Sequence, residues 1–325
     1  MTMKRDLTRR QLLTTGAAGA ALSGCARRPT VDPAIVSIVR APRYGQELYG
    51  KVREILEAHR LDIRGKRVVL KPNLVEFEPE SSINTHPILV HAAYEAFREM
   101  GAGSVEIAEG PGHRRNTLDI ADAAGYFHTV PGFEDRFTDL NLDDVTRFHP
   151  TRQVSRLGKL YLPNTVLGAD LLVSMPKLKT HHWTGATLSM KNLFGVVPSG
   201  VYGWPKNVLH WAGINECIAD LHSFFPRQFA LVDGIVGMEG NGPIQGTPKH
   251  AGVLVAGADP VAVDATCCRI MRIDPLQIRY LDLAASSRAG APVMEQHIHQ
   301  IGEPIAAVAT PFELPPNFQG LRLSA

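Results

Sequence analysis

Downstream of residue 33 the chain alternates short apolar runs with amphipathic stretches, and this alternation is the feature that most limits its fold. Segments 46–58 and 87–100 place apolar residues at helical spacing, with Thr85 as the expected N-cap of the second, and another helix is expected over residues 208–224. Strands that alternate with helices predict an α/β fold with a mostly parallel, doubly wound sheet. A lobe boundary near residue 225 would leave a crevice between two lobes. Six runs have the length and composition of buried strands: residues 34–39, 68–70, 104–108, 169–174, 228–232 and 253–256.

Length, charge and cysteine content set broad bounds on function. With 325 residues, the chain is long enough for one large α/β module over residues 34–325. The net charge of +2 argues neither for nor against binding of nucleic acid. Because no nucleic-acid-binding motif is present, we expect no nucleic-acid partner. No two cysteines are spaced as Cys-x-x-Cys, and an iron–sulfur cluster is therefore not expected.

The first 28 residues have the character of an export signal and linker rather than of a folded segment. An Arg-Arg pair at 9–10 precedes a short, Ala-rich apolar run and resembles the twin-arginine signal. The sequence Leu-Ser-Gly-Cys at 22–25 resembles the lipobox of bacterial lipoproteins, whose cysteine is lipidated. We predict export by the twin-arginine translocase, processing by lipoprotein enzymes, and a lipid anchor on Cys25 at the periplasmic side of the cell envelope. Ala26 follows the cysteine where an aspartate would favour inner-membrane retention, so the outer membrane is favoured.

A basic stretch from Met175 to Pro198 contains an unusual number of functional side chains. Pro176 cannot continue a strand ladder, so we expect a loop after it, and loops at strand ends often carry function. Two interpretations are open: a pocket for a phosphate or carboxylate group, or a solvated basic loop. Five side chains between positions 177 and 191 have almost no acidic neighbour in the sequence: Lys177, Lys179, His181, His182 and Lys191.

Four polar segments each follow a predicted strand directly. If the sheet is parallel, the segments meet at one edge, where ligands of α/β sheets bind. This convergence favours the interpretation of a pocket for an anionic small molecule. Neither the dinucleotide-binding Gly-x-Gly-x-x-Gly nor the P-loop pattern is present, and the common hydrolase and metalloprotease signatures are absent too. The four segments are residues 71–73, 109–114, 177–182 and 233–246.

Six motifs in order resemble the domain-of-unknown-function family 362, from about residue 35 to about residue 289. The resemblance implies no established activity. Many members carry ferredoxin-like cysteine motifs beside this domain, whereas this sequence has none, so the resemblance confers no iron–sulfur cluster. The motifs are Lys-Pro-Asn-Leu at 71–74, Thr-His-Pro at 85–87, Pro-Lys-Leu-Lys-Thr-His at 176–181, Lys-Asn-Leu-Phe-Gly at 191–195, the acidic and Gly-rich segment 233–243, and Asp-Pro-Val-Ala-Val-Asp-Ala at 259–265.

A more distant similarity is to the nickel-pincer lactate racemases. Their Gly-x-His-Arg loop resembles the segment around His113, and their later His and Lys, ten residues apart, resemble His181 and Lys191. The resemblance implies an acid–base role for His113 and His181, a cofactor-holding role for Lys191 and a metal role for His210. The racemases' phosphate motif is replaced here by Asn-Thr-His-Pro at 84–87, so we infer shared pocket position rather than shared reaction.

Candidate roles follow for individual residues. His113 and His181 form a candidate acid–base pair, because imidazole titrates near neutrality. His210, Asp233 and Glu239 are the candidate metal ligands, although Asp233 is equally typical of a turn. The residues expected to hold an anionic ligand, a metal or a nucleotide-like cofactor are Lys71, Lys177, Lys179, Lys191, Gly240 and Gly242.

Two functions from different classes are consistent with this sequence. One is an exported enzyme that performs acid–base chemistry of the racemase or epimerase type on an anionic small molecule. The other is a lipoprotein of the cell envelope that binds an anion or metal without turnover. Trp183, Trp204 and Trp211 would line the pocket in either case, or else pack in the core, which is the commoner role of tryptophan.

Overall fold

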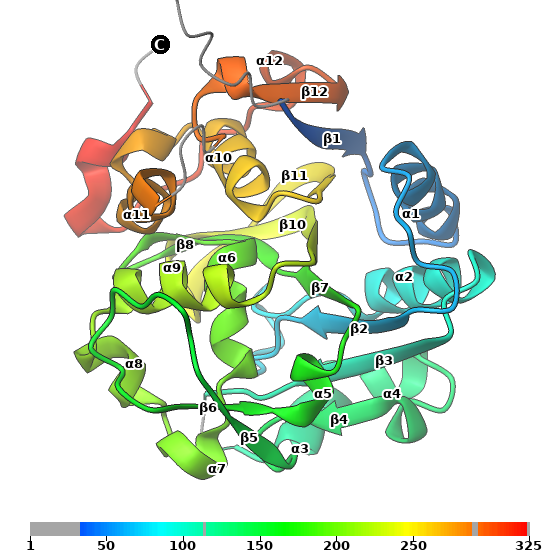
Figure 1. The fold of residues 1–325 in the computed structure, drawn as a ribbon. Coiled ribbons are helices and arrows are strands. Elements are labelled where there is room, and N and C mark those ends of the chain that lie inside the picture. Colours follow the sequence, from blue (N-terminus) through cyan, green and yellow to red (C-terminus); the bar gives the residue numbers. More distant parts are fainter. Residues whose placement is uncertain (1–32, 113–114, 288–291, 324–325) are drawn as a thin grey trace, which may run out of the picture. The chain divides into compact units, whose positions relative to one another are not determined.

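The computed structural model describes residues 33–112, 115–287 and 292–323, so the predictions on Cys25 and His113 lie outside the described residues. Within the unit Pro33–Ala325, the described residues form a ten-stranded sheet. Most neighbouring strands are parallel, and β11 is antiparallel to both of its neighbours. The strands in sheet order are β12 (Ile298–Gly302), β1 (Ala34–Arg40), β11 (Gln245–Gly257), β10 (Gln228–Asn241), β7 (Leu171–Met175), β2 (Arg67–Pro72), β3 (Ser104–Glu109) and β4 (Phe137–Asp139), with β8 (Lys177–His181) and β9 (Gly185–Thr187) extending from β10 (Figure 1).

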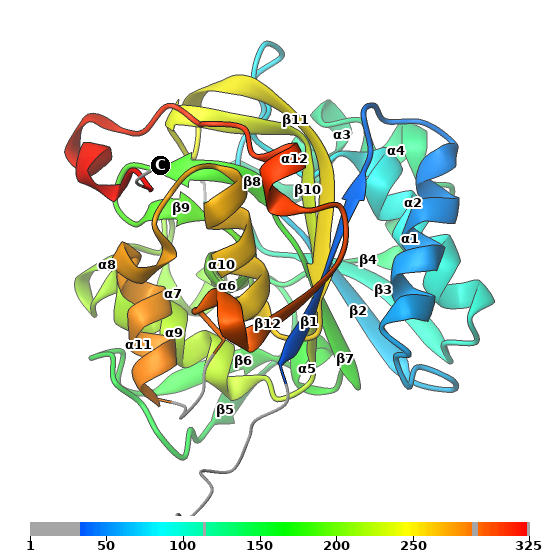
Figure 2. The same ribbon diagram turned by 90° about the horizontal axis from the view of Figure 1, so that it is seen from above.

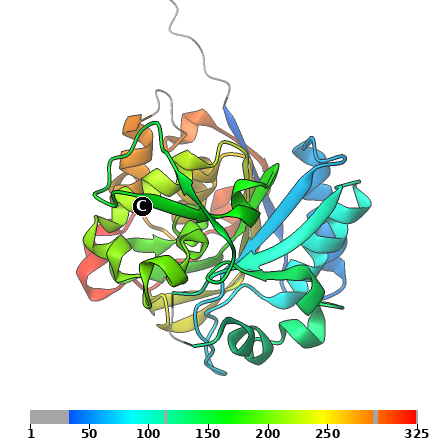
Figure 3. The same cartoon turned by 60° about the horizontal axis from the view of Figure 1, so that its bottom comes forward.

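Two helical layers cover the faces of this sheet, as Figures 2 and 3 show. Helices α1 (Glu47–Ala58), α2 (Pro87–Glu99), α3 (Thr117–Ala123) and α4 (Tyr126–Thr129) contribute to one core. Helices α6 (Ser189–Asn192), α9 (Ile214–Phe224), α10 (Pro260–Ile270) and α11 (Arg279–Ser287) contribute to the other. Successive strand residues alternate between the cores: Leu70 faces the first and Val69 the second. Burial on both faces explains why these strands are continuous apolar runs, and the predicted α/β doubly wound class is confirmed.

Shorter elements complete the fold. Strands β5 (Val145–Phe148) and β6 (Leu160–Pro163) form a separate antiparallel pair. Within the described residues, every helix is too short or too polar to cross a membrane. The remaining helices are α5 (Asn164–Leu167), α7 (Ser199–Tyr202), α8 (Asn207–Trp211) and α12 (Ile305–Val308), with 3-10 turns at Glu134–Arg136, Leu193–Val196, Pro275–Gln277, Glu295–His297 and Pro316–Leu321.

The stretch after Pro176 differs from the expected loop. It continues as β8, which pairs in parallel with β10, and then folds back as β9. Pro176 separates β7 from β8, and its carbonyl oxygen accepts a hydrogen bond from the Asp233 amide at 2.9 Å, which keeps the chain beside β10. All five residues of β8 are buried, so the interpretation of a solvated basic loop was wrong.

Two predicted helix features also differ. The N-cap of α2 is His86, whose Nδ1 accepts a hydrogen bond from the Ile88 amide at 3.2 Å. Thr85 instead accepts from the Asn73 amide and donates to the Met175 carbonyl oxygen, so it joins three segments. The helix expected over residues 208–224 is divided into α8 and α9 at Gly213, whose φ of +104° favours glycine and ends a right-handed helix.

Candidate functional site

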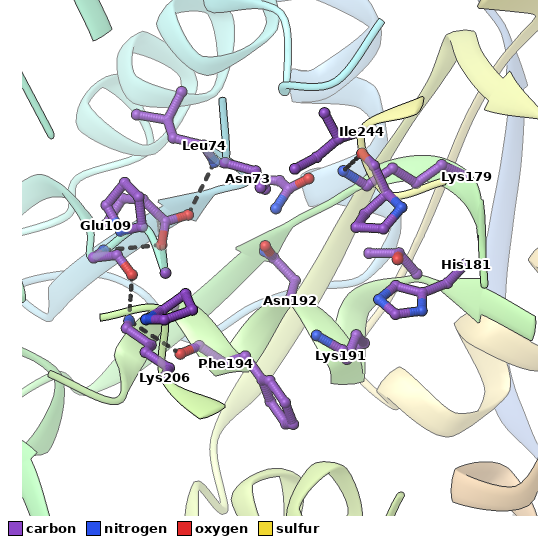
Figure 4. A pocket seen from close by; sticks show the side chains of 18 of the residues that line it. Asn73, Leu74, Glu109, Lys179, His181, Lys191, Asn192, Phe194, Lys206 and Ile244 are labelled. Atoms are coloured by element: carbon purple, nitrogen blue, oxygen red, sulfur yellow. Dashed lines mark hydrogen bonds between the residues drawn. The ribbon is translucent and has the colours of Figure 1, made fainter. Parts of the chain in front are cut away.

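A pocket of about 230 Å³ lies where the carboxyl ends of β2 and β3 meet the strand pair β8 and β9. The ends of these strands are neighbours because β10, β7, β2 and β3 are parallel and adjacent. The predicted convergence of polar segments at one sheet edge is thereby confirmed for residues around Lys71, Glu109 and Lys179. The ionisable side chains that line the pocket are Lys71, Glu109, Lys179, His181, His182, Lys191, Lys206 and His210 (Figure 4).

Lys71 and Glu109 form a buried ion pair in the pocket wall. The Lys71 ammonium lies 2.5 Å from Glu109 Oε2, and each side chain is 1% exposed. The ammonium also donates to the Pro72 carbonyl oxygen at 2.9 Å and to Asn192 Oδ1 at 3.0 Å. Glu109 in turn accepts from the amides of Leu74 and Gly110. Three oxygens already occupy the three donors of Lys71, so this lysine fixes the pocket wall rather than offering a free cation.

Within the described residues, two further lysines of the pocket donate only to backbone carbonyl oxygens. Lys179 donates to Ile83 at 3.0 Å and to Pro243 at 3.2 Å, and burial lowers its pKa well below the usual value. Lys206 donates to the carbonyl oxygens of Gly110 and Phe194. Its pKa falls to about 7, chiefly because it is buried. Burial thus favours the uncharged form of both amines, and an anion bound beside either one would favour the charged form.

Lys206 also has an uncommon backbone conformation. Its φ of +56° lies in the left-handed region, which a side chain with a Cβ rarely adopts. Residues held in this region concentrate at functional sites, where the surrounding structure imposes the strain. Here the backbone conformation accompanies a buried side chain that reaches the carboxyl end of β3.

Among the described residues, the Lys191 ammonium contacts an aromatic ring but no polar group. It lies 3.8 Å from the centroid of the Phe194 ring, and within the described parts of the chain it has neither a hydrogen bond nor an ion pair. Burial, and next the charge of Lys71, lower its pKa to about 7. This amine is therefore close to half protonated at neutral pH, and an anion beside it would favour the charged form.

The short helix that carries Lys191 is anchored by Asp264. The Asp264 carboxylate accepts hydrogen bonds from the amides of Ser189 and Met190 at 2.8 and 3.1 Å, and from the Ser189 hydroxyl at 2.5 Å. Burial raises the pKa of Asp264 to about 7. Asp264 thus acts on Lys191 through the backbone of α6 and fixes the position from which the lysine side chain starts.

Three side chains of the pocket wall also have a buried polar atom without a hydrogen-bond partner in the described structure: Asn73, Thr187 and His210. Asn73 Oδ1 and Thr187 Oγ1 are buried and have no hydrogen-bond partner among the described residues. Both residues line the pocket, and Figure 4 shows Asn73 beside Asn192 and Lys191 around one space. Buried polar groups are nearly always hydrogen-bonded, so an unsatisfied pair in one cavity indicates room for a polar ligand or water.

Histidines complete the polar wall of the pocket. His181 Nδ1 accepts from the Trp183 amide at 3.0 Å, which leaves the proton of a neutral ring on Nε2. Burial, and then the charge of Lys191, lower the pKa of His181 well below its usual value, so the ring is neutral at pH 7. His182 Nδ1 lies 2.7 Å from the Gly242 carbonyl oxygen. His210 is also in the pocket, and burial lowers its pKa to about 4.

The structure places several other predicted site residues outside this pocket. Lys177 forms a buried ion pair with Asp233 at 2.6 Å, and the Tyr44 hydroxyl donates to the same carboxylate at 2.8 Å. Glu239 pairs with Lys249 at 3.1 Å. The three candidate metal ligands are thus separated, and the described residues hold no group of three or more His, Cys, Asp or Glu side chains suited to a metal ion.

The two candidate glycines lie in the β10–β11 hairpin. Gly240 has a φ of +77°, and its amide donates to the Glu313 carbonyl oxygen at 2.8 Å. A Cβ on Gly242 would lie 2.1 Å from the Thr180 carbonyl oxygen, so the glycine allows the hairpin to approach β8 closely. Its place in the fold is explained by backbone packing, and its neighbour Pro243 is the residue that lines the pocket.

The tryptophans differ from the expected core role. Trp183, Trp204 and Trp211 are 53%, 38% and 74% exposed, so core packing was the wrong interpretation for all three. Trp183 lines the pocket, which was the alternative considered. Sequence reasoning also missed Lys206 and Thr187 as pocket residues. No sequence motif includes Lys206, and its left-handed backbone conformation cannot be predicted from the sequence.

The fold and the pocket define an α/β protein with a lysine-rich pocket at the carboxyl edge of its sheet. The chain belongs to the family Domain of unknown function (DUF362), whose family model matches residues 68–269. The membership predicted from the six motifs is confirmed.

Known proteins similar to this chain are diverse. A thylakoid-associated protein of the cyanobacterium Synechocystis sp. is 28% identical over 261 residues, which cover 77% of each chain. The lactate racemase apoprotein from Thermoanaerobacterium thermosaccharolyticum is 14% identical, with a TM-score of 0.47 over 74% of this chain and 57% of that one. A protein from Thermotoga maritima is 11% identical, with a TM-score of 0.36 over 76% of this chain and 60% of that one. The chain therefore spans less than two thirds of the length of both solved structures.

Proposed function

We propose that the pocket binds a small molecule bearing a carboxylate or phosphate group, with Lys191 as the principal cation. The observation that carries this proposal is the Lys191 ammonium, which has neither a hydrogen bond nor an ion pair within the described residues and lies in a cavity with the unsatisfied Asn73 Oδ1 and Thr187 Oγ1. Of the four lysines in the wall, Lys71 is neutralised by Glu109. The other three have no carboxylate within salt-bridge distance in the described structure, and an anion would compensate them.

Electrostatics inside the pocket support an anion rather than a cation or a neutral ligand. Burial lowers the pKa of both Lys191 and Lys206 to about 7, which reflects the cost of holding a charge there without a counterion. An anion supplies that counterion and gains charge-assisted hydrogen bonds, which are stronger than neutral ones. The Asn73 amide and the Thr187 hydroxyl would then orient the remaining oxygens of the ligand.

Replacing Lys191 by methionine tests this function. We expect the affinity for acetate and for inorganic phosphate, measured by isothermal titration calorimetry, to fall at least about tenfold, because a hydrogen bond to a charged group contributes about 1.5–3 kcal/mol. Methionine keeps the length and apolar character of the side chain. The control is Lys159→Met, which removes an exposed lysine remote from the pocket lining and should bind as the wild type does. Equal affinity of Lys191→Met and wild type would refute the proposal.

Acid–base catalysis is the second candidate function, and one observation favours it. His181, with a proton on Nε2 when neutral, lies in the same pocket as a lysine whose pKa is about 7. Groups that titrate near the working pH are suited to proton transfer. Chemistry of the racemase or epimerase type would incorporate solvent deuterium at the α-carbon of a bound hydroxy acid, which NMR detects. His181→Asn should abolish the incorporation and retain binding, whereas a non-catalytic anion-binding protein would show no incorporation in the wild type.

We also propose that the protein is exported and anchored to the cell envelope through Cys25. The support is the twin-arginine pattern and the lipobox of the sequence. Cys25→Ser should move the protein from the membrane fraction to the soluble fraction of the producing cells and should abolish labelling with a radioactive fatty acid. Replacing the buried Cys217 by serine controls for the loss of a thiol and should leave both readouts unchanged. Membrane association of the Cys25→Ser protein equal to that of the wild type would contradict a lipid anchor.

A further inference from the structure

Apolar side chains form part of the mouth of the pocket, beside the partly exposed side chains of His182, Lys191 and His210. The amines of Lys71, Lys179 and Lys206 belong to side chains that are almost completely buried. Farther out, partly or largely exposed apolar residues line the same pocket: Val75, Trp183, Pro205 and Ile244. Inorganic phosphate or a very small acid bound in the interior would not contact these apolar residues, because the interior alone encloses a small anion.

Trp183 is held in place although 53% of it is exposed. Its backbone amide donates to His181 Nδ1, and its indole ring contacts His210 edge-on, with the ring centroids 4.7 Å apart. A second edge-on contact joins it to His182 at 4.9 Å. An indole positioned by three histidines of the pocket presents a fixed apolar surface, which costs little conformational entropy to use in binding.

The other two tryptophans of the chain lie next to pocket residues as well. Trp204 precedes Pro205, and Trp211 follows His210 on α8. Exposed tryptophan is uncommon on a folded protein, and three of three indicate a surface that contacts something apolar. Trp183 lines this pocket, whereas Trp204 lines a separate hollow with Leu142 and Asp139.

We infer that the ligand is an amphiphilic anion, in which a carboxylate or phosphate group is attached to an apolar chain that leaves the pocket along Trp183. The inference rests on the proposed anion-binding function and adds the chemical class of the ligand. The anionic group binds at Lys191, and the apolar chain contacts the rim formed by Trp183, Val75 and Ile244 (Figure 4 shows Ile244 and Lys191). Burial of methylene groups at this rim supplies affinity that the charge alone does not give.

A series of straight-chain carboxylates tests the inference. We expect the affinity of the whole protein for acetate, butanoate, hexanoate and octanoate to rise with length, by about threefold to fourfold for each methylene group that the rim buries. Trp183→Ser should flatten this rise, so that the ratio of octanoate to acetate affinity falls toward one within the variant. Trp183→Phe keeps an apolar ring and should retain most of the rise, which separates the loss of an apolar surface from a general disturbance of the pocket.

The outcomes separate this inference from the function on which it rests. If all four carboxylates bind equally well and Lys191→Met weakens each, the anion site stands and the amphiphilic class is overturned. A length dependence that survives in Trp183→Ser overturns the role of Trp183 and with it the proposed path of the chain. If Lys191→Met changes none of the affinities, the anion-binding function itself fails, whatever the length dependence.

Discussion

Replacing Lys71 by methionine should lower the free energy of unfolding by about 3–5 kcal/mol, because it leaves the Glu109 carboxylate buried without its cation. The two side chains are each 1% exposed, so solvent cannot replace the lost ammonium. The change also removes the hydrogen bonds from Lys71 to the Pro72 carbonyl oxygen and to Asn192. Urea denaturation followed by circular dichroism, with the slope compared between variants, measures the difference.

An exposed ion pair provides the matched control. Arg53 lies 2.9 Å from Glu57 and 3.3 Å from Glu99 on the surface, and exposed pairs on helices contribute about 0.3–0.5 kcal/mol each. Arg53→Met should therefore change stability by less than about 1 kcal/mol. The double variant Lys71→Met with Glu109→Gln removes both charges and should recover part of the loss, because no uncompensated charge stays buried. A Lys71→Met protein as stable as the control would show that the pair is not needed to hold the pocket wall.

The sequence was sufficient to predict where the pocket lies, because parallel strands bring their carboxyl ends to one edge. Lys71 and Glu109 each end a strand, and β2 and β3 are neighbours in parallel register. That the two side chains pair, 38 positions apart, follows only from the register itself. The prediction that Lys71 would help to hold an anionic ligand, a metal or a cofactor did not include this ion pair, since the sequence shows the lysine and not its partner.

The basic stretch shows where sequence periodicity stops being informative. Lys177, Lys179 and His181 alternate along β8, which would place all three on one face. The pairing of β8 with β10 shifts its register between Asp233 and Met238, and Lys177 alone pairs with Asp233. A register shift leaves no mark in composition or spacing, so the division of these lysines between an ion pair and the pocket could not be predicted.

The affinity for acetate should fall about tenfold for each pH unit above 7, because Lys191 is the cation and its pKa in the free protein is about 7. Acetate stays ionised throughout this range, so its own charge does not contribute. Below pH 7 the lysine is already protonated, and the affinity should level off. His181 is neutral there, since burial holds its pKa well below the usual value. Lys191→Met should lose the pH dependence that belongs to this residue, and any steepness that persists would belong to Lys206.

Protein stability should respond to pH in the opposite sense, which gives an independent check without a ligand. The pKa of Lys191 falls from 10.5 to about 7 on folding, so between these values the unfolded chain binds one proton more than the folded chain. The free energy of unfolding should then rise with pH by about 1.4 kcal/mol per unit from this lysine alone. The cost of the buried charge is fully present below pH 7 and absent above 10.5. The free energy of unfolding of Lys191→Met should therefore rise less steeply with pH than that of the wild type. Urea titrations at pH 7.5 to 9.5, a range between the folded and unfolded pKa values of Lys191, measure this difference. Identical slopes of stability against pH in the two proteins would mean that Lys191 keeps its ordinary pKa in the folded state. Lys191 would then be protonated at neutral pH without a bound anion.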